Sequence, residues 1–165
     1  MRVQPNSSPT VRPAIDADGP AIKALIAGTF SEYPGCLFVD AEFPELAAPA
    51  SHYAGQGCSL MVAERDGKVI GSLAVVMTEV AGLAELFKVY VAADARGSGL
   101  AQRLFEAGLS HAKARDANAM ILWTDTRFER GHAFYEKLGF RREPVMRYLA
   151  DESASWEYCF RMPLA

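Results

Sequence analysis

The chain has few cysteines, no long hydrophobic run and no excess of positive charge, and each of these features excludes a class of protein. Cys36, Cys58 and Cys159 are the three cysteines, and they lack the spacing of a metal site or a disulfide framework, which predicts a reducing, cytoplasmic location. No apolar segment is long enough to cross a bilayer, and the first residues lack the apolar core of a secretory signal. The formal net charge of -3 argues against nucleic-acid and membrane partners, which usually select a basic surface.

The chain is long enough for one ordinary domain, because 165 residues of which 50% are apolar can bury a normal core. We expect a loose, polar N-terminus over residues 1–8 and a single domain over residues 9–165. Turn signals and hydrophobic periodicity predict the order β-α-(α)-β-β-β-α-β-α-β-β. A mixed order of this kind is typical of an α/β or α+β sheet with helices on its faces.

Several predicted elements are marked by their ends as well as by their periodicity. Asp66-Gly67 is a two-residue hairpin turn between β-type runs in residues 59–77, and a further strand covers residues 83–92. A helix is expected to begin near Gly99, and another is expected to end at Gly139 and to be followed by two final strands. Residues 31–58 are predicted to be irregular, with a short helix near residues 42–48, and long connections of this kind are often functional.

The segment ARGSG, at residues 95–99, places two glycines between a predicted strand and a predicted helix. The first N–H groups of a helix have no intrahelical partner, and the helix dipole favours negative charge there. Glycines let an anion approach those groups closely, so the segment predicts a phosphate-binding turn. It lacks both the Gly-Lys-Ser/Thr ending of a P-loop and the spacing of a dinucleotide-binding turn. A plain connection between strand and helix is the alternative.

The wider segment VYVAADARGSGLAQRLF resembles the acetyl-CoA-binding segment of the GNAT superfamily of N-acetyltransferases, because Arg96, Gly99 and Ala101 fill its Arg/Gln-x-x-Gly-x-Gly/Ala pattern. FYEKLGF, at residues 134–140, is similar to the family segment Tyr-x-x-x-Gly-Phe, and VRPAIDADGPAIKALI is similar to the family's opening. The resemblance covers residues 11–164. It implies the GNAT fold, a mixed, mostly antiparallel, twisted sheet of about six or seven strands, flanked by about four helices and splayed between its fourth and fifth strands.

The resemblance also implies how acetyl-CoA, as co-substrate, would lie. Its pyrophosphate would contact N–H groups of the glycine turn, and its pantetheine arm would pair with the strand before the turn. The implied cofactor-binding residues are Val89, Tyr90, Val91, Arg96, Gly97, Ser98, Gly99, Leu100 and Ala101. The charge of this half of the chain suits a polyanion, because ten Lys or Arg and only six Asp or Glu lie between Arg96 and Arg147.

Two side chains are candidates for proton transfer. Glu85 is expected to share a strand face with Leu83, Phe87, Val89 and Val91. Burial there would raise the pKa of the Glu85 carboxyl toward that of a useful base, the role that the resemblance implies. Tyr135 matches the tyrosine of the family segment, and the resemblance implies that it is the general acid that protonates the CoA thiolate. The alternatives are a glutamate that lies at the solvent-exposed end of the strand and pairs with an arginine, and a tyrosine that only packs in the core.

Phe128 stands where the family commonly has Asn, so the resemblance does not carry over any cofactor contact that this Asn makes.

The acceptor is the least defined partner. Residues 24–64 contain no Lys or Arg, and they contain the acidic residues Glu32, Asp40, Glu42, Glu45 and Glu64. Aromatic residues are interleaved with them, namely Tyr33, Phe38, Phe43 and Tyr53. An acidic, aromatic surface favours a cationic amine. The alternative is a solvated acidic loop whose aromatic side chains anchor it to the core.

We therefore expect an N-acetyltransferase that transfers the acetyl group of acetyl-CoA to a primary amine of a small molecule or peptide, by direct attack in a ternary complex. Two alternatives stay open: a non-catalytic module of the same fold that senses acyl-CoA, and a nucleotide-binding protein that uses the same turn. No metal site is expected. Homodimerisation stays open as well, because the late strands of the family often pair.

Overall fold

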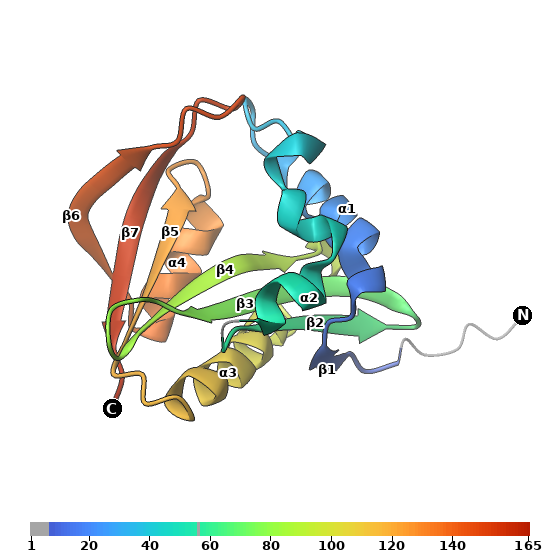
Figure 1. The fold of residues 1–165 in the computed structure, drawn as a ribbon. Coiled ribbons are helices and arrows are strands. Elements are labelled where there is room, and N and C mark those ends of the chain that lie inside the picture. The colour runs from blue at the N-terminus through green and yellow to red at the C-terminus, as the bar shows by residue number, and fades with distance from the viewer. Residues whose placement is uncertain (1–6, 56) are drawn as a thin grey trace, which may run out of the picture.

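A seven-stranded sheet forms the centre of the protein in a computed structural model, which describes residues 7–55 and 57–165 (Figure 1). The strands are β1 (Thr10–Pro13), β2 (Ser59–Arg65), β3 (Lys68–Met77), β4 (Leu83–Val91), β5 (Ala119–Asp125), β6 (Arg141–Tyr148) and β7 (Trp156–Pro163). Their order in the sheet is β1-β2-β3-β4-β5-β7-β6. All neighbouring strands are antiparallel except β4 and β5, which are parallel. The predicted mixed, mostly antiparallel sheet is therefore confirmed.

Four α-helices cover the two faces of the sheet. The helices are α1 (Gly19–Phe30), α2 (Pro49–Ala54), α3 (Leu100–Lys113) and α4 (Glu129–Leu138). Buried side chains of α1 and α2 pack on one face, and those of α3 and α4 belong to the core cluster on the other face. The short helix expected near residues 42–48 is displaced, because the chain forms two 3-10 turns, Asp40–Glu42 and Pro44–Ala47, before α2. Pro44 and Pro49 cause this, since proline cannot continue a helix from its preceding residues.

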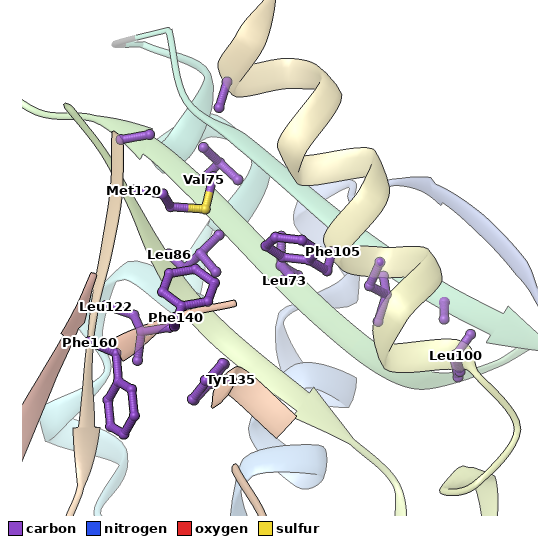
Figure 2. Packing of buried hydrophobic residues seen from close by; sticks show 14 of the residues in the cluster. Leu73, Val75, Leu86, Leu100, Phe105, Met120, Leu122, Tyr135, Phe140 and Phe160 are labelled. Carbon is purple, nitrogen blue, oxygen red and sulfur yellow. The ribbon is translucent and has the colours of Figure 1, made fainter. Parts of the chain in front are cut away.

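The larger core cluster lies between the sheet and helices α3 and α4. Figure 2 shows Phe105 of α3 close to Leu73 of β3, and Tyr135 of α4 on the side of the cluster where Phe140 and Phe160 lie. The predicted hairpin is also present, because Asp66 and Gly67 have φ angles of 53° and 76°. A type I′ turn requires a positive φ at both central residues.

Strands β4 and β5 separate after a short paired segment. Leu83–Leu86 pair with Ala119–Leu122, and no pairing with β5 follows in the second half of β4. The rest of β5 stays in the sheet through β7, as far as the pair Asp125 and Glu157. The predicted splay between the fourth and fifth strands is confirmed, and it leaves one backbone edge of β4 without a neighbouring strand.

A β-bulge interrupts β4 at Lys88. Tyr90 lies opposite Ser72 and Phe87 lies opposite Ala74, so two residues of β4 face one residue of β3 between these pairs. Lys88 has a φ of 54°, an uncommon value for a residue with a side chain, and its carbonyl accepts a hydrogen bond of 2.6 Å from the Ser72 hydroxyl. One extra residue moves every later side chain to the opposite face of the sheet.

The bulge corrects the predicted facing of β4. Val89 and Val91 pack on the cluster beneath α3, whereas Phe87 and Tyr90 pack on the α1 side. The expectation that Glu85 and Phe87 share a face with Val89 and Val91 is therefore wrong. Strict alternation across the strand cannot detect a bulge, because the bulge depends on pairing with β3.

Two expectations from the sequence concern the N-terminal segment and membrane-spanning helices. Residues 1–6, most of the segment predicted to be loose, lie outside the described residues. Among the described helices, none is both long enough and apolar enough to cross a membrane.

We expect Gly108→Val to lower the free energy of unfolding by about 2 kcal/mol or more, because α3 packs directly on β3. A Cβ on Gly108 would lie 2.7 Å from Cδ2 of Leu73 and 2.8 Å from Cγ2 of Val75. Chemical denaturation measures the change. Gly28→Val in α1 is the matched control, since a Cβ there meets no atom within 4 Å. Equal stability of the two variants would contradict the close packing.

Candidate active site

A cleft of about 830 Å³ opens where β4 and β5 separate. The second half of β4, the glycine turn, the start of α3 and one side of α4 line it. Of the residues predicted to bind the cofactor, those that line the cleft are Val89, Tyr90, Val91, Arg96, Gly97, Gly99, Leu100 and Ala101. Ser98 does not line it, because its hydroxyl donates to the Ala95 carbonyl at 2.6 Å and so folds the turn on itself.

The glycine turn presents backbone N–H groups to this cleft. Gly97 and Gly99 have φ angles of 77° and 79°, which explains why glycine stands at both positions. A Cβ on either glycine would meet no atom, so the space beside the turn is open. The N–H of Arg103 donates to the Gly99 carbonyl at 3.1 Å, and the N–H groups of residues 100–102 precede that first helical bond. The turn therefore has the geometry of an anion site.

Two arginines and one carboxylate lie at the positive end of the cleft. Glu32, in the turn after α1, accepts two hydrogen bonds from Arg96, at 2.7 and 2.6 Å, and one from Arg130 at 3.1 Å. These contacts lower the pKa of Glu32 to about 2, with the Arg96 hydrogen bond as the largest cause. The Arg130 guanidinium also lies 5.7 Å from the centre of the Tyr33 ring. Glu32 thus holds both guanidinium groups that line this end of the cleft, a contact that the sequence pattern did not indicate.

Tyr135 lies in the wall of the cleft that α4 provides. Its side chain is 7% exposed, and its ring centre lies 6.0 Å from those of Phe140 and Phe160. Burial raises the pKa of the Tyr135 phenol well above its ordinary value, so the hydroxyl is protonated at neutral pH. Among the described residues nothing hydrogen-bonds to this hydroxyl, which is therefore free to donate into the cleft. His132 instead bonds the Asp125 carbonyl at 2.9 Å.

Glu85 lines a second, smaller cavity of about 250 Å³. This cavity lies between β4, β5 and β7 and the loops that follow α1 and β6. The two loops meet above it, since the Leu37 N–H donates to Ser153 Oγ at 2.8 Å (Figure 1). Burial raises the pKa of the Glu85 carboxyl, and the nearby Arg147 opposes that shift. Within the described part of the chain, Glu85 has neither an ion pair nor a hydrogen bond.

The two cavities meet at Tyr90 and Phe128, which line both of them. The Phe128 ring centre lies 5.8 Å from that of Phe30 and 4.9 Å from that of Tyr33. The Tyr90 ring centre lies 6.3 Å from that of Phe30. Phe128 and Tyr90 therefore lie at the boundary that the two cavities share. Glu85 lines one of these cavities and Tyr135 lines the other.

The predicted acidic surface of residues 24–64 is only partly present, because four of its five carboxylates are neutralised by cations. Besides Glu32, these are Asp40 on Lys23, Glu45 on Lys88 and Glu64 on Arg12, each at 2.7 Å. Of the five, Glu42 lines the smaller of the two cavities. The other carboxylates of the smaller cavity are Glu85, Asp125, Asp151 and Glu157.

Sequence reasoning missed Asp151 and Glu157 because they come from the β6–β7 loop and the start of β7. No local pattern connects these two segments with Glu85 on β4 or with Asp125, the last residue of β5. Within residues 7–55 and 57–165, no group of three His, Cys, Asp or Glu side chains could hold a metal ion.

Comparison with known proteins places this geometry in a family. The model of the Acetyltransferase (GNAT) family matches residues 24–140. A mycothiol acetyltransferase from Streptomyces avermitilis is 33% identical over 79 residues, which are 48% of this chain and 26% of that protein. An uncharacterized N-acetyltransferase from Methanocaldococcus jannaschii is 29% identical over 91 residues, 52% of this chain and 40% of that protein. The matched segments thus cover well under half of both curated relatives.

Solved structures share the fold over nearly the whole chain. A GNAT-family acetyltransferase from Staphylococcus aureus superposes with a TM-score of 0.82 at 14% identity, covering 96% of this chain and 100% of that one. A Salmonella typhimurium protein, solved with acetyl-CoA as its cofactor, gives a TM-score of 0.73 at 18% identity, covering 96% and 95%. Family model, sheet order and splayed strands agree, and the chain belongs to the GNAT acetyltransferase family.

Proposed function

We propose that the protein transfers the acetyl group of acetyl-CoA to a primary amine of a small molecule or peptide, by direct attack in a ternary complex. The observation that carries this proposal is the meeting of two cavities at Tyr90 and Phe128. The larger one has free N–H groups and guanidinium groups suited to phosphates. The smaller one has a partly buried carboxylate suited to an amine. The Salmonella structure, solved with acetyl-CoA as its cofactor, supports acetyl-CoA as the co-substrate.

In the proposed reaction the chain positions two reactants and moves two protons. Glu85 accepts a proton from the attacking amine, directly or through water, while the amine nitrogen forms its bond to the thioester carbon. A backbone N–H at the bulge, that of Val89, donates to the carbonyl oxygen as negative charge develops there. The carbon–sulfur bond then breaks, and Tyr135 donates its proton to the departing thiolate.

The surroundings of Glu85 and Tyr135 favour an enzyme over a non-catalytic module that only senses acyl-CoA. A sensor has no need of an unpaired carboxylate beside the β4–β5 opening or of a protonated hydroxyl without a partner. Burial raises the pKa of both groups, and neither has an ion pair or a hydrogen bond among the described residues. Both groups therefore remain available to exchange a proton with a bound substrate, which catalysis requires and binding alone does not.

We expect Glu85→Gln to lower kcat/KM by about 10²–10⁴-fold, because the amide cannot accept the proton of the amine. In the unmodified protein kcat/KM rises with pH as Glu85 loses its proton. Because burial raises the pKa of Glu85, this acid limb of the pH profile lies at a higher pH than for an ordinary glutamate. The variant loses this limb. Measurement of CoA release against pH tests both expectations, with acetyl-CoA affinity as the control for folding. An unchanged acid limb in the variant would exclude Glu85 as the base.

We expect Tyr135→Phe to lower kcat by tenfold or more while leaving the free energy of unfolding nearly unchanged, since the ring contacts remain and the hydroxyl has no protein partner to lose. Tyr148→Phe is the matched control, because Tyr148 is 52% exposed and lines neither cavity. Equal kcat values for the two variants would contradict the role of Tyr135 as proton donor.

We expect Glu32→Gln to tighten CoA binding about two- to fivefold, because the variant releases Arg96 and Arg130 from a carboxylate with which the CoA phosphates compete. Calorimetric titration with CoA measures the dissociation constant. Glu64→Gln, which breaks a comparable pair with Arg12, serves as the control and leaves CoA affinity unchanged. Weaker binding in Glu32→Gln would show that Glu32 positions the arginines rather than competing for them.

A further inference from the structure

The chemistry of the smaller cavity narrows the class of amine that it can accept. Five carboxylates line it, those of Glu42, Glu85, Asp125, Asp151 and Glu157. Lys88 and Arg147 are its only cations among the described residues.

Both cations are already paired. Lys88 Nζ lies 2.7 Å from Glu45 Oε1, and Arg147 Nε donates to Glu157 Oε1 at 2.7 Å. The Arg147 guanidinium also stacks 4.3 Å from the centre of the Trp123 ring. A carboxylate on the acceptor would compete with Glu45 or Glu157 for one of these cations and would lie among the remaining acids, so the cavity disfavours anionic acceptors.

The carboxylates are less completely neutralised than the cations. Asp125 has a cationic partner, because Arg127 donates to both of its oxygens at 2.8 and 2.7 Å. Within the described residues the Asp151 carboxylate accepts hydrogen bonds only from Ser155, through the N–H at 2.7 Å and the hydroxyl at 2.8 Å. Glu42 and Glu85 have no ion pair within the described residues. Carboxylates without an ion pair therefore line the cavity on β4, at Glu85, and on the two covering loops, at Glu42 and Asp151.

Aromatic rings line the same cavity as these carboxylates. Phe30 is the centre of the group, with ring centres of Phe43, Tyr90 and Phe128 at 6.1, 6.3 and 5.8 Å. All four rings line the cavity, as does Trp123. Ring faces attract ammonium groups and pack well on methylene groups, and they offer little to a polar or branched carrier.

We infer that the acceptor is an unbranched alkyl diamine, with the reacting amine at Glu85, the methylene arm between the rings, and the distal ammonium at Glu42 and Asp151. The inference rests on the proposed function and specifies the substrate class of the same site. Amines with a carboxylate at the distal end or beside the nitrogen are disfavoured, because each cation that lines the cavity in the described part of the chain already has a carboxylate partner.

Three amines with one arm length test the inference: 1,5-diaminopentane, pentylamine and 5-aminopentanoate, which differ in the charge of the distal end. We expect kcat/KM to fall about fivefold from the diamine to pentylamine and about fivefold again to the amino acid, the effect of one partly exposed ion pair at each step. Dissociation constants for the same amines, measured by calorimetry on protein saturated with CoA, are expected to follow the same order. Equal values for all three amines in both measurements, or a preference for 5-aminopentanoate, would overturn the inference.

Two variants assign the distal site. Glu42→Gln is expected to reduce the preference for the diamine over pentylamine to about twofold or less, since Glu42 lines the cavity and the amide carries no charge. Asp40→Asn, on the same 3-10 turn, is the matched control, because Asp40 pairs with Lys23 outside the cavity and its loss leaves the preference intact. A preserved preference in Glu42→Gln would contradict the distal site.

The binding measurement separates this inference from the proposed function. Absence of CoA release with every amine, together with the expected order of dissociation constants, would refute the transferase and support the diamine site. CoA release from acetyl-CoA at equal rates with all three amines would support the transferase and refute the diamine site.

Discussion

The separation of β4 from β5 after Leu86 is the constraint on which the rest of the structure depends. A strand inside a sheet normally has neighbours on both edges, and the second half of β4 has only β3. Backbone groups along the free edge need partners, and these can come from water or from the amides of a bound molecule. The strand therefore forms one wall of the larger cleft, whose opposite wall is α4. The separation also allows the two cavities to meet.

The bulge at Lys88 decides which side chains serve each cavity. Before the bulge, Glu85 points toward the smaller cavity; after it, Val89 and Val91 turn toward the core beneath α3, and Tyr90 lies at the junction. Without the extra residue, the valines would project on the side of Glu85. Lys88 adopts a backbone conformation unusual for a residue with a side chain, and its pair with Glu45 and the bond from Ser72 hold it there.

Ion pairs distribute charge unevenly between the two cavities. At the larger cleft, Glu32 compensates part of the charge of two arginines and leaves an excess of positive charge. At the smaller cavity the cations are the paired groups, and carboxylates remain. One chain of formal net charge -3 thus offers a positive site and a negative site a few residues apart on β4. In the proposed reaction this arrangement would hold the CoA phosphates and the acceptor amine at different sites.

The sequence by itself determined the element order, the hairpin at Asp66-Gly67, the glycine turn before α3 and the matching segment around Tyr135. These features are local, because positive φ angles, helix termini and hydrophobic periodicity depend on neighbouring residues. Only the tertiary structure decided the bulge at Lys88 and the partners of the acidic residues. Pairing with β3 creates the bulge, and the carboxylates of the smaller cavity come from loops and strands far apart in the chain. Contacts between distant segments follow from packing, which no spacing along the chain records.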